Sequence, residues 1–212
     1  MTSHPPEDSA IVERARTGDA QALGAAFDAF RPRLKMMVRL RLHPTLRRRV
    51  DASDVLQEAY VELARQLPSY AEKQPLPFFL WIRRVTGQRL AQVHRRHFGA
   101  EKRDPTLEVF LQQEPMPQAG SQVLADQLLA SMTSVSQKAI RAEACELLRQ
   151  SLERLDPLDR EILALRHFEE LTNLEAATEL GIETSAASKR YFRALRRLRG
   201  ELAKIPGLLP DA

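Results

Sequence analysis

A strongly basic segment close to the carboxyl end has residue types that could bind nucleic acid. Its lysine and arginine residues occur without an acidic residue among them: Lys189, Arg190, Arg193, Arg196, Arg197 and Arg199. At about 100° per residue of a helix, Ala187, Ala194 and Leu198 fall on one arc, and most of the cations fall on the opposite side. The apolar arc can pack on a core, which leaves the cations free to bind guanine edges and phosphates in a major groove.

The residues before this segment favour a helix-turn-helix over an ordinary solvated helix, which is the usual meaning of a charge run alone. Thr172 and Glu175 have the spacing of a capping box, which begins a helix. Ala177 is followed four residues later by Gly181, a pattern that lets two helices cross closely through a tight turn. We therefore predict that the next helix, residues 184–199, contacts DNA. Its predicted contact residues are Ser185, Ser188, Lys189, Arg190, Arg193, Arg196 and Arg197.

Acidic residues recur at four-residue spacing in the first half of the chain. Asp54, Glu58 and Glu62 would form a stripe on one helix face, with Gln57 beside it. Such a stripe is unfavourable for DNA and would suit a basic or polar protein surface. The spacing alone fits a solvated helix face equally well, so both interpretations stay open at this point.

A third segment combines aromatic and basic side chains. Phe78, Phe79 and Trp81 are followed by the arginines Arg83, Arg84, Arg89, Arg95 and Arg96. Stacking surfaces together with cations are typical of single-strand binding, although the aromatic residues fit a core, and packing is the commoner role for Trp81. His94 and His97 lie three residues apart, but no carboxylate or cysteine joins them at ligand spacing, so we predict neither a metal site nor a cofactor.

Helices are the elements that must position these residues. Apolar residues repeat at the three-to-four spacing of helices over long stretches, and only 8 of the 212 residues are glycine. The sequence thus predicts an all-α fold. The single cysteine, Cys145, excludes an internal disulfide, and no apolar run reaches the roughly 18 residues that cross a bilayer. Because the amino terminus also lacks a secretory signal, we expect a cytoplasmic protein with no membrane segment.

The composition of the chain and the positions of its helix-breaking residues predict two small helical domains joined by a linker. Proline, glycine and glutamine concentrate beyond Phe98, so we place a first domain at residues 9–98, a linker at 99–136 and a second domain with the helix-turn-helix at 137–204. A short helix at 121–130 is compatible with this linker. Local signals predict a helix break near Gly18 and boundaries at these further positions: a break at Pro32, a helix start at Asp51 or Ser53, a helix end at Pro68, and a start at Asp156 with Pro157.

Taken in order, these residues resemble the extracytoplasmic-function (group 4) branch of the sigma-70 family. The segment 51–58 (DASDVLQE) is similar to the family's polymerase-binding helix. Residues 81–85 (WIRRV), with Arg95 and Arg96, are similar to the segment that melts and reads the minus-ten element. Residues 159–166, 171–181 and 190–198 resemble the reader of the minus-thirty-five element.

The resemblance implies a transcription initiation factor, not an enzyme, that brings core RNA polymerase to promoter DNA. It implies contacts with the β′ clamp and β flap of the polymerase, and it assigns clamp binding to Asp54, Gln57 and Glu58. It further implies minus-ten binding by Trp81, Arg83, Arg84, Arg89, Arg95 and Arg96, with a flipped base held in a pocket built partly by the preceding loop. The seven residues of helix 184–199 would bind the minus-thirty-five duplex. Whether an anti-sigma protein holds the factor inactive is left open.

Some positions depart from the family's pattern. Gln88 and Gln92 stand where the family commonly has Asn and Asp, and Ala186 and Ala187 stand where it usually has Thr and Val. The promoter sequence therefore does not follow from the resemblance.

Two other classes of function have to be compared with a transcription initiation factor. A helix-turn-helix regulator that works without polymerase is the main alternative, with the first domain as a sensor or dimerisation unit. An enzyme is disfavoured, since the sequence has no phosphate-binding glycine loop and no nucleophile with a nearby base.

Overall fold

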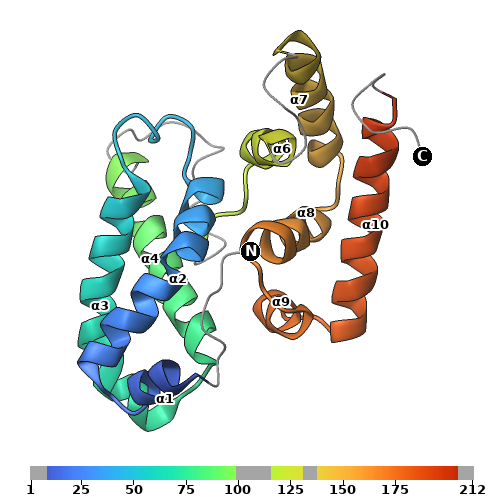
Figure 1. Cartoon of the computed structure of the whole chain (residues 1–212). Helices are drawn as coiled ribbons and strands as arrows, with labels where there is room; N and C mark the ends of the chain where they lie inside the picture. Colours follow the sequence, from blue (N-terminus) through green and yellow to red (C-terminus); the bar gives the residue numbers. More distant parts are fainter. Residues whose placement is uncertain (1–8, 99–115, 131–137, 205–212) are drawn as a thin grey trace. The chain divides into compact units, whose positions relative to one another are not determined.

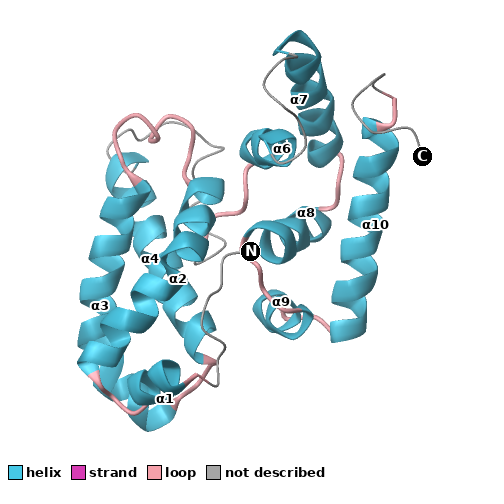
Figure 2. Ribbon diagram, viewed as in Figure 1, coloured by secondary structure: helices cyan, strands magenta, loops and turns pink. Residues whose placement is uncertain are grey.

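The computed structural model describes residues 9–98, 116–130 and 138–204, and these form helices and connecting turns without a strand (Figure 2). The predicted all-α fold is therefore confirmed. The chain divides into two compact units, Met1–Pro117 and Gln118–Ala212. Each unit has its own set of packed helices (Figure 1).

The first unit is built from α1 (Ala10–Arg16), α2 (Ala20–Arg41), α3 (Ala52–Lys73) and α4 (Phe78–Phe98). The three long helices pack on one another, and the short α1 lies against α2 and α3 at one end of them (Figure 1). Gly18, with a φ of 99°, makes the predicted break between α1 and α2. Of the two candidates for the start of α3, Asp51 is the cap, because its carboxylate accepts the backbone N–H of Ser53.

Two predicted helix boundaries at prolines are wrong. α2 continues through Pro32, and α3 continues through Pro68 as far as Lys73. An interior proline removes one backbone hydrogen bond and costs about 3 kcal/mol. Both prolines are exposed, so the carbonyl that loses its partner faces water, while the neighbours Leu34 and Tyr70 are buried in the core. Burial of the apolar stripe on each side outweighs the local cost.

α4 is the central helix of this unit, because fourteen of its residues are buried, including polar ones such as Arg83 and Thr86. Gly87 makes one close approach possible. A Cβ atom at Gly87 would lie 2.2 Å from the terminal methyl carbon of Met116, so a larger residue at this position would force the end of the Met116 side chain to move. The chain between Phe98 and Met116 lies outside the described residues.

The second unit contains α6 (Ser121–Ala130), α7 (Lys138–Glu153), α8 (Pro157–Leu163), the π-helical turn η1 (Ala164–Phe168), α9 (Asn173–Leu180) and α10 (Thr184–Leu202). α6 lies within the segment predicted as linker, but it packs mainly on α7 through buried Leu124 and Leu129. The backbone N–H of Ala119 also donates to the Glu161 carboxylate of α8 at 3.1 Å. These contacts attach α6 to the second unit, whereas residues 99–115 and 131–136 of the predicted linker lie outside the described residues.

α9 and α10 form the predicted helix-turn-helix. The capping box at the start of α9 is reciprocal, since Thr172 Oγ1 accepts the Glu175 N–H and Glu175 Oε2 accepts the Thr172 N–H. Gly181 ends α9 in the left-handed conformation, with a φ of 63°. Asp156 caps α8 ahead of Pro157, as the sequence predicted.

A buried histidine makes the stability of the first unit sensitive to acid. The Nε2 atom of His94, in α4, accepts the backbone N–H of His43 at 3.4 Å, and the His94 side chain is fully buried. Burial is the largest cause, and the nearby His43 and His97 act in the same direction, so that together they lower the pKa of His94 to about 4. Since an unfolded histidine titrates near 6.5, the unfolded chain binds a proton more readily than the folded one between these pH values.

We therefore expect the contribution of His94 to the free energy of unfolding to be constant above pH 6.5. It should fall by up to roughly 3 kcal/mol as the pH drops to about 4. Urea unfolding followed by circular dichroism at several pH values measures it. His94→Gln should flatten the profile over that range. His97→Gln, which changes an exposed ring on the same helix and removes only its smaller contribution to the His94 pKa, should leave most of the pH dependence in place. An identical pH dependence in the His94→Gln variant and the parent chain would contradict the assignment.

Candidate functional site

The acidic side chains of α3 occupy two different environments. Asp54 and Gln57 are exposed, and Glu58 is partly exposed while its carboxylate accepts from Arg96 Nη2 at 2.6 Å. Glu62, in contrast, is buried and accepts from Arg65, Gln66 and Arg89. The hydrogen bond from Arg65 is the largest of the contributions that lower the pKa of Glu62 to about 2. The predicted stripe of three carboxylates is therefore incomplete, and the open acidic face ends at Glu58.

An apolar side chain completes this face. Val61 is 70% exposed, and helical spacing places it beside Asp54, Gln57 and Glu58. Sequence reasoning missed Val61, because a single valine on a charged face carries no pattern of its own. We call the surface made by Asp54, Gln57, Glu58 and Val61 the α3 face.

The residues predicted to bind the minus-ten element divide into buried and exposed groups. Arg84, Arg95 and Arg96 are exposed. Arg83 is only 1% exposed, so the described conformation leaves it no surface for DNA. Arg89 is partly buried and donates to Glu62 across from α4 to α3 and to Gln92 at 2.8 Å. These two arginines are thus held by contacts within the first unit, which the spacing of charges along α4 did not indicate.

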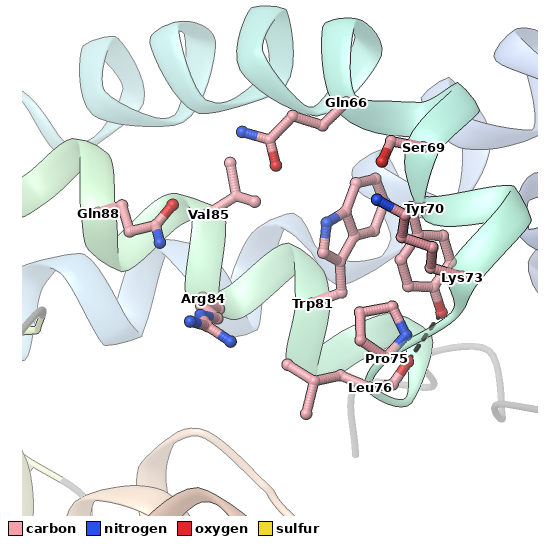
Figure 3. A pocket seen from close by; sticks show the side chains of 10 residues that line it. All are labelled: Gln66, Ser69, Tyr70, Lys73, Pro75, Leu76, Trp81, Arg84, Val85 and Gln88. Atoms are coloured by element: carbon pink, nitrogen blue, oxygen red, sulfur yellow. Dashed lines mark hydrogen bonds between the residues drawn. The ribbon is translucent and has the colours of Figure 1, made fainter.

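Trp81 is part of a wall beside a cavity. Its ring stacks on Tyr70 of α3 with centroids 4.2 Å apart and an interplanar angle of 17°. The Tyr70 hydroxyl donates to the Leu76 carbonyl at 2.9 Å, which fixes the loop between α3 and α4. The cavity next to this pair has a volume of about 390 Å³ (Figure 3). Its lining consists of Gln66, Ser69, Tyr70, Lys73, Pro75, Leu76, Trp81, Arg84, Val85 and Gln88.

The cavity combines an aromatic wall with hydrogen-bonding side chains. Figure 3 shows the Gln66 and Gln88 amides on the side of Val85, and Trp81 with Tyr70 and Pro75 on the other side. Planar amides can donate and accept at the edge of a planar ring, while an aromatic wall can stack on its face. The arrangement can therefore hold a flat polar group such as a nucleobase. Ser69 and Lys73 fall in the segment 69–77 before α4, the segment predicted to build part of a base pocket, whereas sequence reasoning missed Gln66.

α10 presents most of its basic side chains at the surface. Ala187, Ala194 and Leu198 are buried, whereas most predicted contact residues are exposed: Ser185, Lys189, Arg193, Arg196 and Arg197. Ser188 and Arg190 are partly exposed. Phe192 is 68% exposed among these cations, and the apolar arc predicted from the sequence did not include it. The surface can bind a polyanion and also make an apolar contact.

Known proteins resemble this chain over most of its length. Residues 145–198, which include the helix-turn-helix, match the family described as "Sigma-70, region 4". The ECF RNA polymerase sigma factor SigD of Mycobacterium tuberculosis is 29% identical over 202 residues, which cover 95% of this chain and 87% of that protein. The RNA polymerase sigma-E factor of Streptomyces avermitilis is 31% identical over 153 residues, 72% of each protein. This chain is an extracytoplasmic-function sigma factor of the sigma-70 family.

A solved structure has the same fold. It is described as "Structure of CnrH in complex with the cytosolic domain of CnrY", and it aligns with this sigma factor with a TM-score of 0.52 and 19% identity. The alignment covers 94% of this chain and 99% of the other. The likeness supports the helical architecture of the two units and the helix-turn-helix.

Membership of the family confirms the function that the resemblance implied. The protein is an alternative sigma factor, which directs core RNA polymerase to specific promoters and initiates transcription there. Its partners are therefore core polymerase and promoter DNA, and nothing in the comparisons favours a regulator that works without polymerase. None of the helices in the described ranges is long and apolar enough to cross a membrane.

Two neighbouring arginines of α4 allow the structural and surface roles to be separated. Arg83→Ala should lower the free energy of unfolding by about 2 kcal/mol or more, because a buried side chain and its packing are lost. Arg84→Ala removes an exposed side chain and should change it by less than about 0.5 kcal/mol. Urea unfolding of the full chain compares the two variants. Equal effects of both substitutions would contradict the buried role of Arg83.

Proposed function

We propose that the first unit of this sigma factor binds core polymerase and opens the minus-ten region, while the second docks on the minus-thirty-five duplex. The separation of charge between two helices carries the proposal. α3 exposes acidic side chains that disfavour DNA, and α10 exposes only basic or neutral ones along its polar arc. In this proposal the predicted first domain, residues 9–98, and the predicted second domain, 137–204, keep their assigned roles, and the factor acts in the cytoplasm by binding rather than by catalysis.

The α3 face is the proposed polymerase-binding surface. Asp54, Gln57 and Glu58 offer carboxylates and an amide around the exposed Val61. Protein interfaces often combine an apolar centre with a polar rim that fixes partner and register. A basic surface on the β′ clamp is the complement that this face would select.

The cavity beside Trp81 is the proposed site for an unstacked base of the minus-ten element. Extruding a base costs a few kilocalories per mole, which must be recovered by stacking and hydrogen bonding in the pocket. The wall of Trp81 and Tyr70 offers stacking, and Gln66, Gln88 and Arg84 offer polar contacts. Arg95 and Arg96 are exposed further along α4 and would neutralise the separated strand. In this proposal Arg83 and Arg89 support α4 from inside the unit.

The polar arc of α10 is the proposed minus-thirty-five surface. Ser185, Ser188 and Lys189 begin the arc, and the arginines Arg190, Arg193, Arg196 and Arg197 continue it. Arginine binds guanine edges and phosphates, and the serine hydroxyls suit either a base or a phosphate. The exposed ring of Phe192 adds an apolar group that could contact a thymine methyl.

Reversing charge on the α3 face should weaken polymerase binding. Asp54→Lys combined with Glu58→Lys replaces attraction by repulsion at a basic partner surface, and we expect about tenfold or greater loss of affinity for core polymerase. Titration of labelled core polymerase measures it. Glu13→Lys with Asp28→Lys makes the same charge change at exposed positions elsewhere on the first unit and serves as the control. Undiminished binding by the α3 variant would count against this surface.

Removing exposed cations of α4 should impair opening rather than docking. Arg84→Ala with Arg95→Ala should abolish run-off transcription from an intact duplex promoter while leaving polymerase binding unchanged. A template with a pre-melted minus-ten bubble should restore much of the activity, because strand separation is supplied in advance. Arg48→Ala with Arg49→Ala removes the same charge from exposed positions outside α4 and is the matched control. The opening role is wrong if the α4 variant transcribes the duplex normally, or if the bubble gives no rescue.

A further inference from the structure

One carboxylate of the second unit binds two arginines of α10. Asp159, in α8, accepts from Arg190 Nη1 at 2.6 Å and from Arg193 Nε and Nη2 at 2.9 and 2.8 Å. The Asp159 side chain is 3% exposed, whereas that of Arg193 is 54% exposed. A buried anion therefore lies beneath cations that still reach the surface of α10.

Packing of α8 on α10 alone gives no reason for a buried carboxylate at position 159. Burying a charge is costly unless it is paired, and an apolar side chain of similar size often packs two helices as well or better. Burial alone would raise the pKa of Asp159, but hydrogen bonds from Arg193 and Arg190 outweigh it and keep the pKa below its usual value. Asp159 thus stays charged, which suggests that its role concerns the arginines it binds.

The hydrogen bonds of Asp159 fix the plane of the Arg193 guanidinium. Arg193 donates through Nε and Nη2, two parallel bonds that determine the orientation of a planar group. The Nη1 atom makes neither of these bonds, so that edge of the group stays available to a ligand. An arginine held in this way loses less side-chain entropy when it binds DNA.

We propose that Asp159 is a positioning residue for promoter recognition, which orients the guanidinium groups of Arg190 and Arg193 for the minus-thirty-five duplex. The inference rests on the proposed role of α10 in binding that duplex. Asp159 touches no DNA in this mechanism and acts through the two arginines. This positioning role predicts a different effect of removing Asp159 than the negative charge of Asp159 alone would predict.

Charge and positioning predict opposite effects of removing Asp159. A carboxylate near DNA repels phosphates whatever their sequence, so its loss should strengthen binding to any duplex. Loss of orientation should weaken the contacts that depend on geometry, and these are made with the correct sequence only. The ratio of promoter affinity to non-promoter affinity therefore separates the two effects.

The test uses the sigma factor assembled with core polymerase and two short duplexes. One carries the minus-thirty-five region of a promoter mapped by run-off transcription, and the other carries the same bases in scrambled order. For Asp159→Asn we expect the affinity ratio to fall about tenfold, with binding of the scrambled duplex equal to the parent or tighter. Asp156→Asn is the matched control: it removes the same charge from the exposed neighbour that forms no hydrogen bond to Arg193 and leaves the Asp159–Arg190 bond in place, and asparagine preserves the helix cap. Its ratio should not change.

A second variant keeps the inference testable if Asp159→Asn unfolds the second unit, which thermal unfolding by circular dichroism reveals. Arg193→Lys retains the positive charge but loses the two parallel bonds, so its affinity ratio should fall as well. The inference is overturned if Asp159→Asn leaves the affinity ratio unchanged, whether the binding of both duplexes stays the same or tightens equally. With an unfolded Asp159 variant, an unchanged ratio in Arg193→Lys overturns it.

Removal of the two arginines distinguishes this inference from the proposed function itself. Arg190→Ala with Arg193→Ala should weaken both duplexes and reduce the dependence of affinity on salt concentration. If this variant binds both duplexes like the parent, the arginines do not contact DNA, and the proposed surface fails together with the role of Asp159. If it weakens binding while Asp159→Asn leaves the ratio intact, only the positioning role fails.

Discussion

Burial of α4 is the constraint on which the first unit depends. Because this helix is covered over most of its surface, its charged residues must either be bound inside the unit or emerge along a narrow strip. Glu62 meets the first requirement by binding Arg89 across the α3–α4 contact, together with Arg65 and Gln66 from its own helix. The strip that remains carries Arg84 and Arg95, so the protein core determines which cations are available for DNA.

The two units use a similar solution for arginines that lie close to a core. Glu62 and Asp159 are both buried carboxylates, and each binds at least one arginine from a neighbouring helix. A guanidinium group suits this role since it stays charged and offers several N–H donors in one plane. The consequences differ, however. Arg89 is largely retained within the first unit, whereas Arg193 keeps half of its side chain at the surface and can still bind a ligand.

Features that depend on neighbouring residues could be predicted from the sequence. Features that depend on contacts between residues far apart in the chain could not. The capping box of Thr172, the cap at Asp51 and the turn at Gly181 are local, and the structure has all three. Pro68 has an equally local signal, but burial of Tyr70 beyond it extends α3 to Lys73. That error also gave Ser69 and Lys73 the wrong secondary structure, because these two cavity-lining residues lie in the last turns of α3 and not in a loop. Burial of Arg83 and Glu62 likewise depends on which helix is central, and no spacing along one helix reveals it.

The two glutamines of α4 that depart from the family's pattern have different environments, which bears on promoter choice. Gln92 accepts from Arg89 at 2.8 Å and so takes part in the network that joins α4 to Glu62. Gln88, one turn earlier, lines the cavity beside Trp81 (Figure 3). If the cavity holds a base, as we propose, an amide at position 88 meets the edge of that base with both a donor and an acceptor. Its longer side chain reaches further into the cavity than the usual asparagine would. Any difference in base preference from relatives at this cavity should therefore originate at Gln88, whereas Gln92 would affect it only through the position of α4.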